Sequence, residues 1–140
     1  MNPDIRLLEI GFGKGLILDK LARKGFECYG VDITLEGLKH NPNIHDGITF
    51  REAYAWNLPF GNDQFDIVYS TDVLEHIPPL YVGETIKELK RVSKNLNVHC
   101  IATVPDSKRF GYDCHLSVLP IEVWQKHFWG VNNYIFEREF

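Results

Sequence analysis

The sequence lacks the features of a membrane or exported protein. None of its apolar runs approaches the ~20 residues that a membrane-spanning helix needs. Its N-terminus, MNPDIRLLEI, does not show the basic-then-apolar order of a signal peptide. We therefore expect a cytoplasmic protein that does not associate with a membrane.

Positive charge and cysteine are also scarce. The chain has 15 lysines and arginines against 19 acidic residues, so its formal charge is −4. This balance creates no field that attracts a nucleic acid backbone, and we do not expect a nucleic acid as partner. The three cysteines, Cys28, Cys100 and Cys114, form no CxxC pair, which predicts reduced thiols.

The length and the hydrophobic pattern indicate one α/β domain over residues 1–140. With 44% hydrophobic residues, the chain is long enough for one core and too short for two ordinary ones. Short β-branched runs alternate with segments of helical period, which predicts a doubly wound, mostly parallel sheet with helices on both faces. The expected strands are 5–10, 26–33, 48–53, 65–70, 98–104 and 133–140, and the expected helices lie around 17–22, 35–38, 82–96 and 121–128.

Three glycines follow the first expected strand in LLEIGFGKG, residues 7–15. Gly11, Gly13 and Gly15 leave the backbone bare at the carboxyl end of a strand, where a doubly wound sheet binds its ligand. The dinucleotide fingerprint GxGxxG would need its third glycine at the position of Leu16. The stretch predicts a ligand-binding turn, and a tight strand-to-helix turn without a ligand is the alternative.

Two acidic residues indicate the kind of ligand. Asp32 ends the second expected strand, where its two oxygens can accept both hydroxyls of a ribose. A dinucleotide and S-adenosylmethionine both carry such a ribose, so Asp32 does not separate them. Glu9 precedes Gly11 by two residues, where it repels a phosphate and attracts an ammonium or a sulfonium group. Glu9 therefore favours S-adenosylmethionine, and a nicotinamide-dependent oxidoreductase is the rival.

The motifs EIGFGKG and GVDIT, followed by AYAWNLPFGNDQFDIVYSTDVLEHI, resemble those of the class I S-adenosylmethionine-dependent methyltransferases. The likeness is greatest to the type 11 group, which includes enzymes of ubiquinone and menaquinone biosynthesis, and it runs from about Leu7 to Asp106. It implies a Rossmann-like fold whose last strand is antiparallel. The family usually also has a helix before the first strand and one more C-terminal strand, for which residues 1–140 leave no room.

The same resemblance implies S-adenosylmethionine as cofactor and assigns its contacts. One departure is Tyr54, where the family often has Asp, so a hydrogen bond to the adenine amino group is lost. The implied contacts are Glu9, Gly11, Phe12 and Gly13 for the methionine part, Asp32 for the ribose, Ile33, Ala55 and Trp56 for the adenine, and Ser70 for the amino acid end.

Candidate catalytic residues follow the fourth expected strand. A sulfonium methyl is already activated, so transfer depends first on placing the nucleophile, and a hydroxyl nucleophile benefits from a base. Asp72, Glu75 and His76 have the i, i+3, i+4 spacing that brings three side chains to one side of a helical turn, and His76 is the best base among them. Two alternatives stay open: local capping and packing, or a magnesium-type site completed by His115.

We expect the chain to transfer a methyl group from S-adenosylmethionine to a small-molecule acceptor. The alternatives are a cofactor-binding module without turnover, and a metal-assisted O-methyltransferase acting on a quinone or an RNA 2′-hydroxyl. An exposed last strand is an edge through which two copies can pair as a homodimer. Lys108 and Arg109 either bind an anion or are solvated. The residues that either wall an acceptor pocket or form core are Phe110, Tyr112, Trp124, Phe128 and Trp129.

Overall fold

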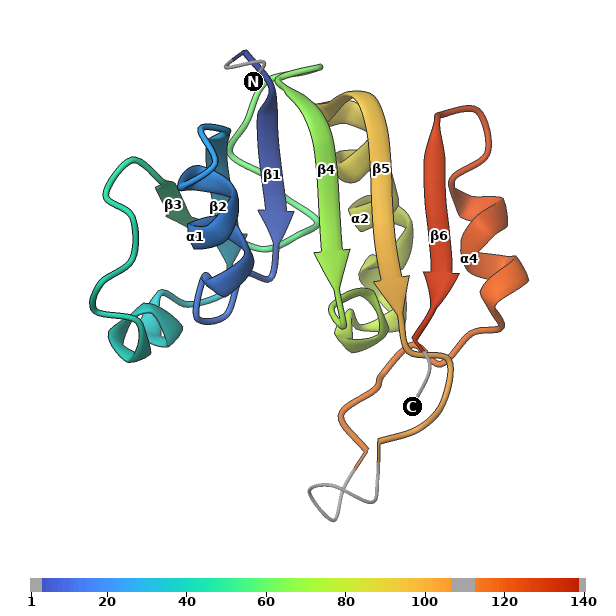
Figure 1. Cartoon of the computed structure of the whole chain (residues 1–140). Coiled ribbons are helices and arrows are strands. Elements are labelled where there is room, and N and C mark those ends of the chain that lie inside the picture. Colours follow the sequence, from blue (N-terminus) through green and yellow to red (C-terminus); the bar gives the residue numbers. More distant parts are fainter. Residues whose placement is uncertain (1–3, 107–112, 139–140) are drawn as a thin grey trace.

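The strands form one sheet in the order β3-β2-β1-β4-β5-β6, and every neighbouring pair is parallel (Figure 1). The computed structural model describes residues 4–106 and 113–138. The strand order reverses between β1 and β4, which is the switch point of a doubly wound sheet. The strands are β1 (Arg6–Ile10), β2 (Glu27–Asp32), β3 (Thr49–Glu52), β4 (Phe65–Thr71), β5 (Ser93–Ile101) and β6 (Asn133–Glu137).

The central strand β1 shows why its sequence forms a buried parallel strand. Leu7, Leu8 and Ile10 are each at most 5% exposed. Leu7 packs in the core on one face of the sheet, and Leu8 and Ile10 pack in the core on the other. A nearly continuous apolar run is typical of a parallel strand that is covered on both faces.

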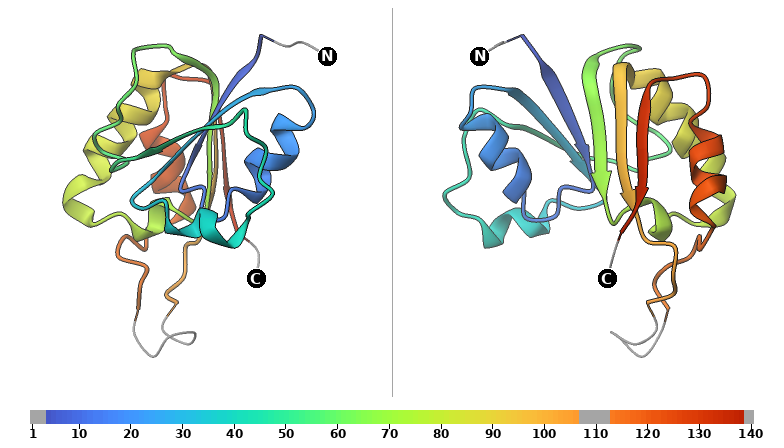
Figure 2. Two further views of the ribbon diagram at one scale, coloured as in Figure 1. Left: turned by 90° about the vertical axis from the view of Figure 1, so that its left-hand side faces the viewer. Right: turned by 45° about the vertical axis from the view of Figure 1, so that its right-hand side comes forward.

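Helices cover both faces of the sheet, as the sequence predicts (Figure 2). Helix α1 packs on one face through Leu18 and Ala22, whereas α2 and α4 pack on the opposite face. Short 3-10 helices, η1 and η2, follow β2 and β4 at the edge where the strands end. The bounds are α1 (Leu16–Ala22), η1 (Glu36–His40), η2 (Leu74–His76), α2 (Pro79–Val92) and α4 (Ile121–His127).

Helix α2 begins three residues earlier and ends four residues earlier than the expected helix over 82–96. It begins at Pro79, whose fixed φ and missing N–H suit the first turn of a helix. It ends at Val92, because the backbone of Ser93 turns to φ −91° and ψ 121°. Leu96 therefore lies in β5 rather than on the apolar face of the helix.

The last strand is parallel, and the expectation of an antiparallel last strand is wrong. β6 pairs with β5 in a parallel register that sets Ile135 beside His99. Helix α4 carries the chain back between the two strands, and a strand that follows such a crossover enters the sheet in the same direction as the strand before it. Within the described residues β6 is the edge of the sheet.

The C-terminal aromatic residues that the structure describes belong mainly to the core. Trp124 and Phe128 are 1% and 0% exposed, whereas Trp129 is 70% exposed. Apolar side chains at helical spacing therefore form core beneath α4 rather than an acceptor wall. The other candidates of this segment, Lys108, Arg109, Phe110 and Tyr112, lie outside the described residues.

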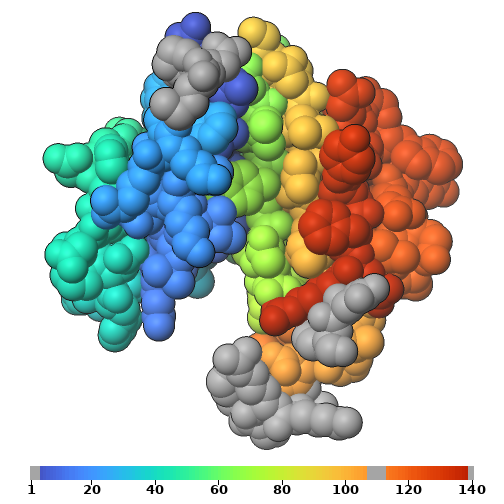
Figure 3. All heavy atoms as spheres, viewed as in Figure 1, coloured from blue at the N-terminus to red at the C-terminus, as the bar shows by residue number. Residues whose placement is uncertain are grey.

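One face of the sheet is only partly covered. Helix α1 lies over β1 and β2, whereas β4, β5 and β6 reach the surface on the same face (Figure 3). Along β6, Tyr134 and Phe136 are 67% and 49% exposed, and Ile135 between them is buried, as expected for alternating sides of a strand. The three cysteines form no disulfide. Among the described helices, none has the length and apolar character needed to span a membrane.

Candidate functional site

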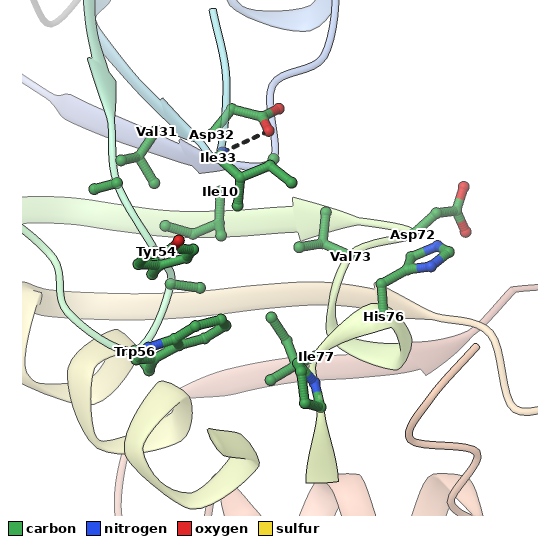
Figure 4. A pocket seen from close by; sticks show the side chains of 14 residues that line it. Ile10, Val31, Asp32, Ile33, Tyr54, Trp56, Asp72, Val73, His76 and Ile77 are labelled. Atoms are coloured by element: carbon green, nitrogen blue, oxygen red, sulfur yellow. Dashed lines mark hydrogen bonds between the residues drawn. The ribbon is translucent and has the colours of Figure 1, made fainter. Parts of the chain in front are cut away.

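A cavity of about 430 Å³ lies at the carboxyl ends of β1 to β4, beside the switch point (Figure 4). Its lining comes from the ends of β1 and β2 and from the segments that follow the four strands. A doubly wound sheet binds its ligand at this place, and the volume is ordinary for a small-molecule pocket.

The turn after β1 brings bare backbone to the cavity. Gly11 has a φ of +71°, and its N–H donates to the carbonyl oxygen of Val31 over 2.7 Å. A Cβ at Gly11 would lie 2.4 Å from Cγ2 of Val73, which is too close for a real contact. At Gly13, with a φ of +53°, no heavy atom lies within 4 Å of such a Cβ. The turn therefore needs glycine at position 11 for packing, and it leaves open space at position 13.

The carboxylate of Asp32 is held by this turn. Its Oδ2 accepts a hydrogen bond from the Gly13 N–H over 2.9 Å, and its Oδ1 accepts one from the Ile33 N–H over 2.7 Å. An ionised carboxylate has about four lone-pair sites, so each oxygen can accept one more hydrogen bond. The two backbone donors fix the orientation of the group without consuming its capacity for two ligand hydroxyls.

The loop after β3 supplies an aromatic wall. The rings of Tyr54 and Trp56 stack with centroids 4.6 Å apart, and Trp56 stacks on Tyr81 of α2 at 4.3 Å. The planes are tilted by only 10° and 8°. Tyr54 and Trp56 line the cavity, and Ala55 between them is 6% exposed. The stack therefore joins the loop to α2.

Helix α2 fixes the same loop through an ion pair. Glu88 accepts a hydrogen bond from the Leu58 N–H over 2.7 Å, and Arg91 donates to the carbonyl oxygen of Phe60 over 2.7 Å. Glu88 and Arg91 are themselves 2.6 Å apart, and this bond lowers the pKa of the Glu88 carboxyl. The pair sets the position of the aromatic wall without facing the cavity.

Glu9 lies beneath the glycine turn rather than in the cavity. It is 4% exposed, and the Tyr69 hydroxyl donates to its carboxyl group over 3.2 Å. Burial raises the pKa of Glu9 to about 8, so the ligand-free protein holds it protonated at neutral pH. The prediction that Glu9 attracts a cationic ligand assumes an ionised carboxylate. That form is favoured only when a nearby cation lowers the pKa of Glu9.

Phe12 and Ser70 are also buried. The ring of Phe12 packs 4.8 Å from that of Phe50 in the core under α1. The Ser70 hydroxyl lies 2.7 Å from Nδ1 of His99, and Nε2 of His99 lies 3.3 Å from Oδ1 of Asn97. Burial lowers the pKa of His99 to about 3, so the ring is neutral and Ser70 donates to it. Neither residue lines the cavity.

The candidate catalytic residues after β4 have different surroundings. Asp72 has a φ of 56°, and its carboxylate pairs with Arg138. Glu75 is fully buried, which raises the pKa of its carboxyl group, and it does not line the cavity. His76 lines the cavity, and its Nδ1 lies 2.9 Å from the carbonyl oxygen of Cys114. Because a carbonyl oxygen only accepts, Nδ1 carries the proton and Nε2 is the basic atom.

His115 converges on His76, as the magnesium-type alternative requires. The centroids of the two rings are 4.8 Å apart. The described residues whose potential ligand atoms all lie within 4.8 Å of one another are His76, Cys114 and His115. Neither Asp72 nor Glu75 belongs to this cluster, so the described structure does not assemble the oxygen-rich set.

The cavity brings together predicted residues from the carboxyl-terminal regions of β1, β2, β3 and β4. It also includes residues that sequence reasoning missed. Three of the missed residues, Ala53, Tyr54 and Val73, come just after a strand, and this position is the signal that could have found them. The predicted residues that line it are Gly11, Asp32, Ile33, Ala55, Trp56, Asp72 and His76, and those that do not are Glu9, Phe12, Gly13, Ser70 and Glu75. The additional lining residues are Ile10, Val31, Ala53, Tyr54, Val73, Ile77 and Pro78.

The parallel sheet, its strand order and the crevice at its switch point define a Rossmann-like α/β domain. Residues 8–100 match the family model described as a methyltransferase domain, and the chain belongs to this family.

Known relatives agree with this assignment. The chain is 37% identical over 93 residues to a ubiquinone biosynthesis O-methyltransferase of Ruegeria pomeroyi, covering 61% of this chain and 37% of that protein. The YcgJ protein of Bacillus subtilis has a similar structure, with a TM-score of 0.69 and 25% identity over 90% of this chain and 60% of that one. A SAM-dependent methyltransferase of Methanosarcina mazei has a TM-score of 0.59 and 29% identity, covering 68% of this chain and 50% of that one. The chain thus spans less than two fifths of the curated relative.

Proposed function

We propose that the cavity binds S-adenosylmethionine and that the chain transfers its methyl group to a hydroxyl of a small-molecule acceptor. The observation that carries the proposal is the Asp32 carboxylate, fixed by the N–H groups of Gly13 and Ile33 with free lone pairs on both oxygens. The family and the names of the relatives support methyl transfer, and those names support oxygen as the methylated atom.

The residues present fit an adenosine. Asp32 accepts the two ribose hydroxyls. Ile33 is 66% exposed at the cavity, and together with Ala55 and Trp56 it offers apolar surface to the adenine. An exposed large apolar side chain beside a pocket is typical of a ligand-binding surface. Tyr54 offers a ring face in place of the carboxylate that the family often has.

The glycine turn is the proposed site of the methionine part. Open space at Gly13 and bare backbone at Gly11 allow the close approach of a ligand. A cationic ligand near the turn favours the ionised form of Glu9 beneath it, since an opposite charge lowers the pKa of a buried carboxyl group. Cofactor binding and ionisation of Glu9 are therefore coupled.

His76 is the proposed base. The acceptor oxygen attacks the methyl carbon, the carbon–sulfur bond breaks with its electron pair going to sulfur, and Nε2 of His76 takes the hydroxyl proton. S-adenosylhomocysteine and the methylated acceptor are the products. Asp72 and Glu75 are positioning residues in this proposal, because one is paired with Arg138 and the other does not reach the cavity.

The first test is calorimetric titration of the whole chain with S-adenosylhomocysteine. Asp32→Asn removes the charge and is expected to weaken binding by about 10- to 100-fold, since hydrogen bonds to a charged group contribute roughly 1.5–3 kcal/mol. Asp46→Asn changes a fully exposed aspartate and should bind like the wild type. NAD is titrated in parallel, and tighter binding of NAD would replace the proposal with the oxidoreductase reading.

The second test measures turnover with methyl-labelled cofactor and simple catechols as acceptors. His76→Gln is expected to slow transfer by about 10²- to 10⁴-fold, the usual contribution of a general base, with unchanged affinity for S-adenosylhomocysteine. Binding of the cofactor without transfer to any acceptor would support the binding module instead.

We also propose that residues 1–140 act as one domain and that two copies pair through β6. The edge position of β6 and the exposed Tyr134 and Phe136 support pairing. Sedimentation equilibrium should give a dimer for the wild type and a monomer for Glu137→Pro, which removes a backbone donor on the side of β6 that faces away from β5. A wild-type monomer at high concentration would contradict this part of the proposal.

A further inference from the structure

A cluster of nitrogen, sulfur and oxygen ligands lies at the His76 end of the cavity. His76 comes from η2, whereas Cys114 and His115 come from the segment that follows β5. One potential ligand atom from each of the three lies within 4.8 Å of the other two. Oδ2 of Asp106 lies 3.6 Å from Sγ of Cys114 and 3.9 Å from Nε2 of His115. The proposed cofactor contacts involve none of these side chains.

Hydrogen bonds orient both imidazole rings for metal binding. Nδ1 of His76 lies 2.9 Å from the carbonyl oxygen of Cys114, and Nδ1 of His115 lies 2.6 Å from that of Val104. Each carbonyl oxygen requires a proton on the nitrogen that it faces, so both Nε2 atoms keep a free lone pair. A histidine that ligates a metal commonly donates its other N–H to a backbone carbonyl, which fixes the tautomer and the ring orientation.

We propose that His76, Cys114 and His115 bind a zinc-class divalent ion through Nε2, Sγ and Nε2, with Asp106 beside them as an oxygen donor. Thiolate and imidazole ligands suit zinc, whereas magnesium prefers oxygen ligands. Zinc bonds of about 2.0–2.3 Å set tetrahedral ligand atoms roughly 3.3–3.8 Å apart, so ligand atoms that now lie up to 4.8 Å apart need to approach by at most about 1.5 Å. His115 is only 8% exposed, so its side chain is already enclosed by the protein before a metal binds.

The site would join the segment after β5 to η2. It competes with the base role of His76, because both use Nε2, so the metal-loaded protein loses proton transfer to His76. Metal binding itself needs no S-adenosylmethionine and is measured without it. The two proposals can therefore fail independently.

The test is titration of the whole, metal-free chain with Co²⁺ and then Zn²⁺. One Co²⁺ per chain should produce a thiolate-to-cobalt charge-transfer band. Zn²⁺ should displace the Co²⁺ and abolish this band. Cys114→Ser should abolish the band and weaken Zn²⁺ binding by more than about tenfold, because even outer partners of a metal site contribute about 10- to 100-fold. Cys100→Ser, at another half-buried cysteine, should keep both properties.

Either of two results would overturn the proposal. One is a wild-type cobalt complex without the thiolate band, which indicates surface histidines alone. The other is equal zinc affinity of the wild type and Cys114→Ser. Thermal unfolding in a chelator shows whether Cys114→Ser is folded, and if it is not, the wild-type band and its retention in Cys100→Ser decide the matter.

Discussion

Replacing Gly11 with alanine tests the packing of the glycine turn. A residue with a Cβ at a φ of +71° costs about 1–2 kcal/mol. The new methyl group would also lie 2.4 Å from Cγ2 of Val73, and overpacking of this kind costs about 1–3 kcal/mol. We therefore expect Gly11→Ala to lower the free energy of unfolding by about 2–5 kcal/mol, a large share of the roughly 5–15 kcal/mol of an ordinary domain.

Variants at two other glycines separate the cost of backbone strain from the cost of the contact with Val73. Gly13→Ala has the same kind of backbone strain, but no atom lies within 4 Å of its Cβ, so we expect a loss of about 1–2 kcal/mol. Gly83→Ala lies on the exposed side of α2 with open space around its Cβ, and we expect a gain of about 1 kcal/mol from helix propensity. The difference between the first two variants isolates the contact with Val73.

The assay is urea unfolding followed by tryptophan fluorescence. Val73→Ala in the Gly11→Ala background should recover part of the loss, because it removes the colliding methyl groups. Equal losses in Gly11→Ala and Gly13→Ala, or no recovery in the double variant, would refute the packing argument. Gly13→Ala should also block S-adenosylhomocysteine, since the methyl group enters the open space proposed for the ligand.

Three further predictions concern buried or clamped groups. The pKa of Glu9 is near 4.5 in the unfolded chain and about 8 in the folded protein, so the stability of the wild type falls as the pH rises from 4.5 to 8. Thermal unfolding should therefore show that Glu9→Gln gains a few kcal/mol of stability relative to the wild type by pH 8. His99 has a folded pKa of about 3 against 6.5, so wild-type stability falls as the pH drops from 6.5 toward 3, and His99→Gln should lack this acid dependence. Arg91→Lys loses the guanidinium group that binds both the Phe60 carbonyl and Glu88, which loosens the aromatic wall. Calorimetry should therefore show weaker binding of S-adenosylhomocysteine, with Lys87→Arg as a surface control.

Much of the fold and many residues of the proposed cofactor site could be predicted from local sequence. A nearly continuous apolar run marks β1, and residues that directly follow a parallel strand meet at one edge of the sheet. Gly11 and Asp32 could be placed at the cavity for this reason, and the family resemblance added Ile33. Trp56 follows β3 in the same way, although its stack with Tyr81 needs the packing of α2 and was not predicted.

Features that depend on distant contacts could not be predicted. The direction of β6 depends on how α4 crosses the sheet, and the family resemblance indicated the wrong direction. The charge of Glu9 depends on burial, which the sequence does not show at a position next to a glycine turn. Val73 belongs to no functional motif, so its contact with Gly11, which shapes the turn, could not be predicted from the sequence.

The two ends of the cavity are therefore built by different rules. The Asp32 end is made by strand ends and by hydrogen bonds between near neighbours, so few substitutions elsewhere disturb it. The His76 end depends on Cys114 and His115, which reach it from a different segment and orient its imidazole through a backbone carbonyl. In the proposed function the first end binds the cofactor, and the second end faces the acceptor and carries the proposed metal site. Changes of specificity in this chain should therefore be sought around residues 113–119 rather than in the glycine turn.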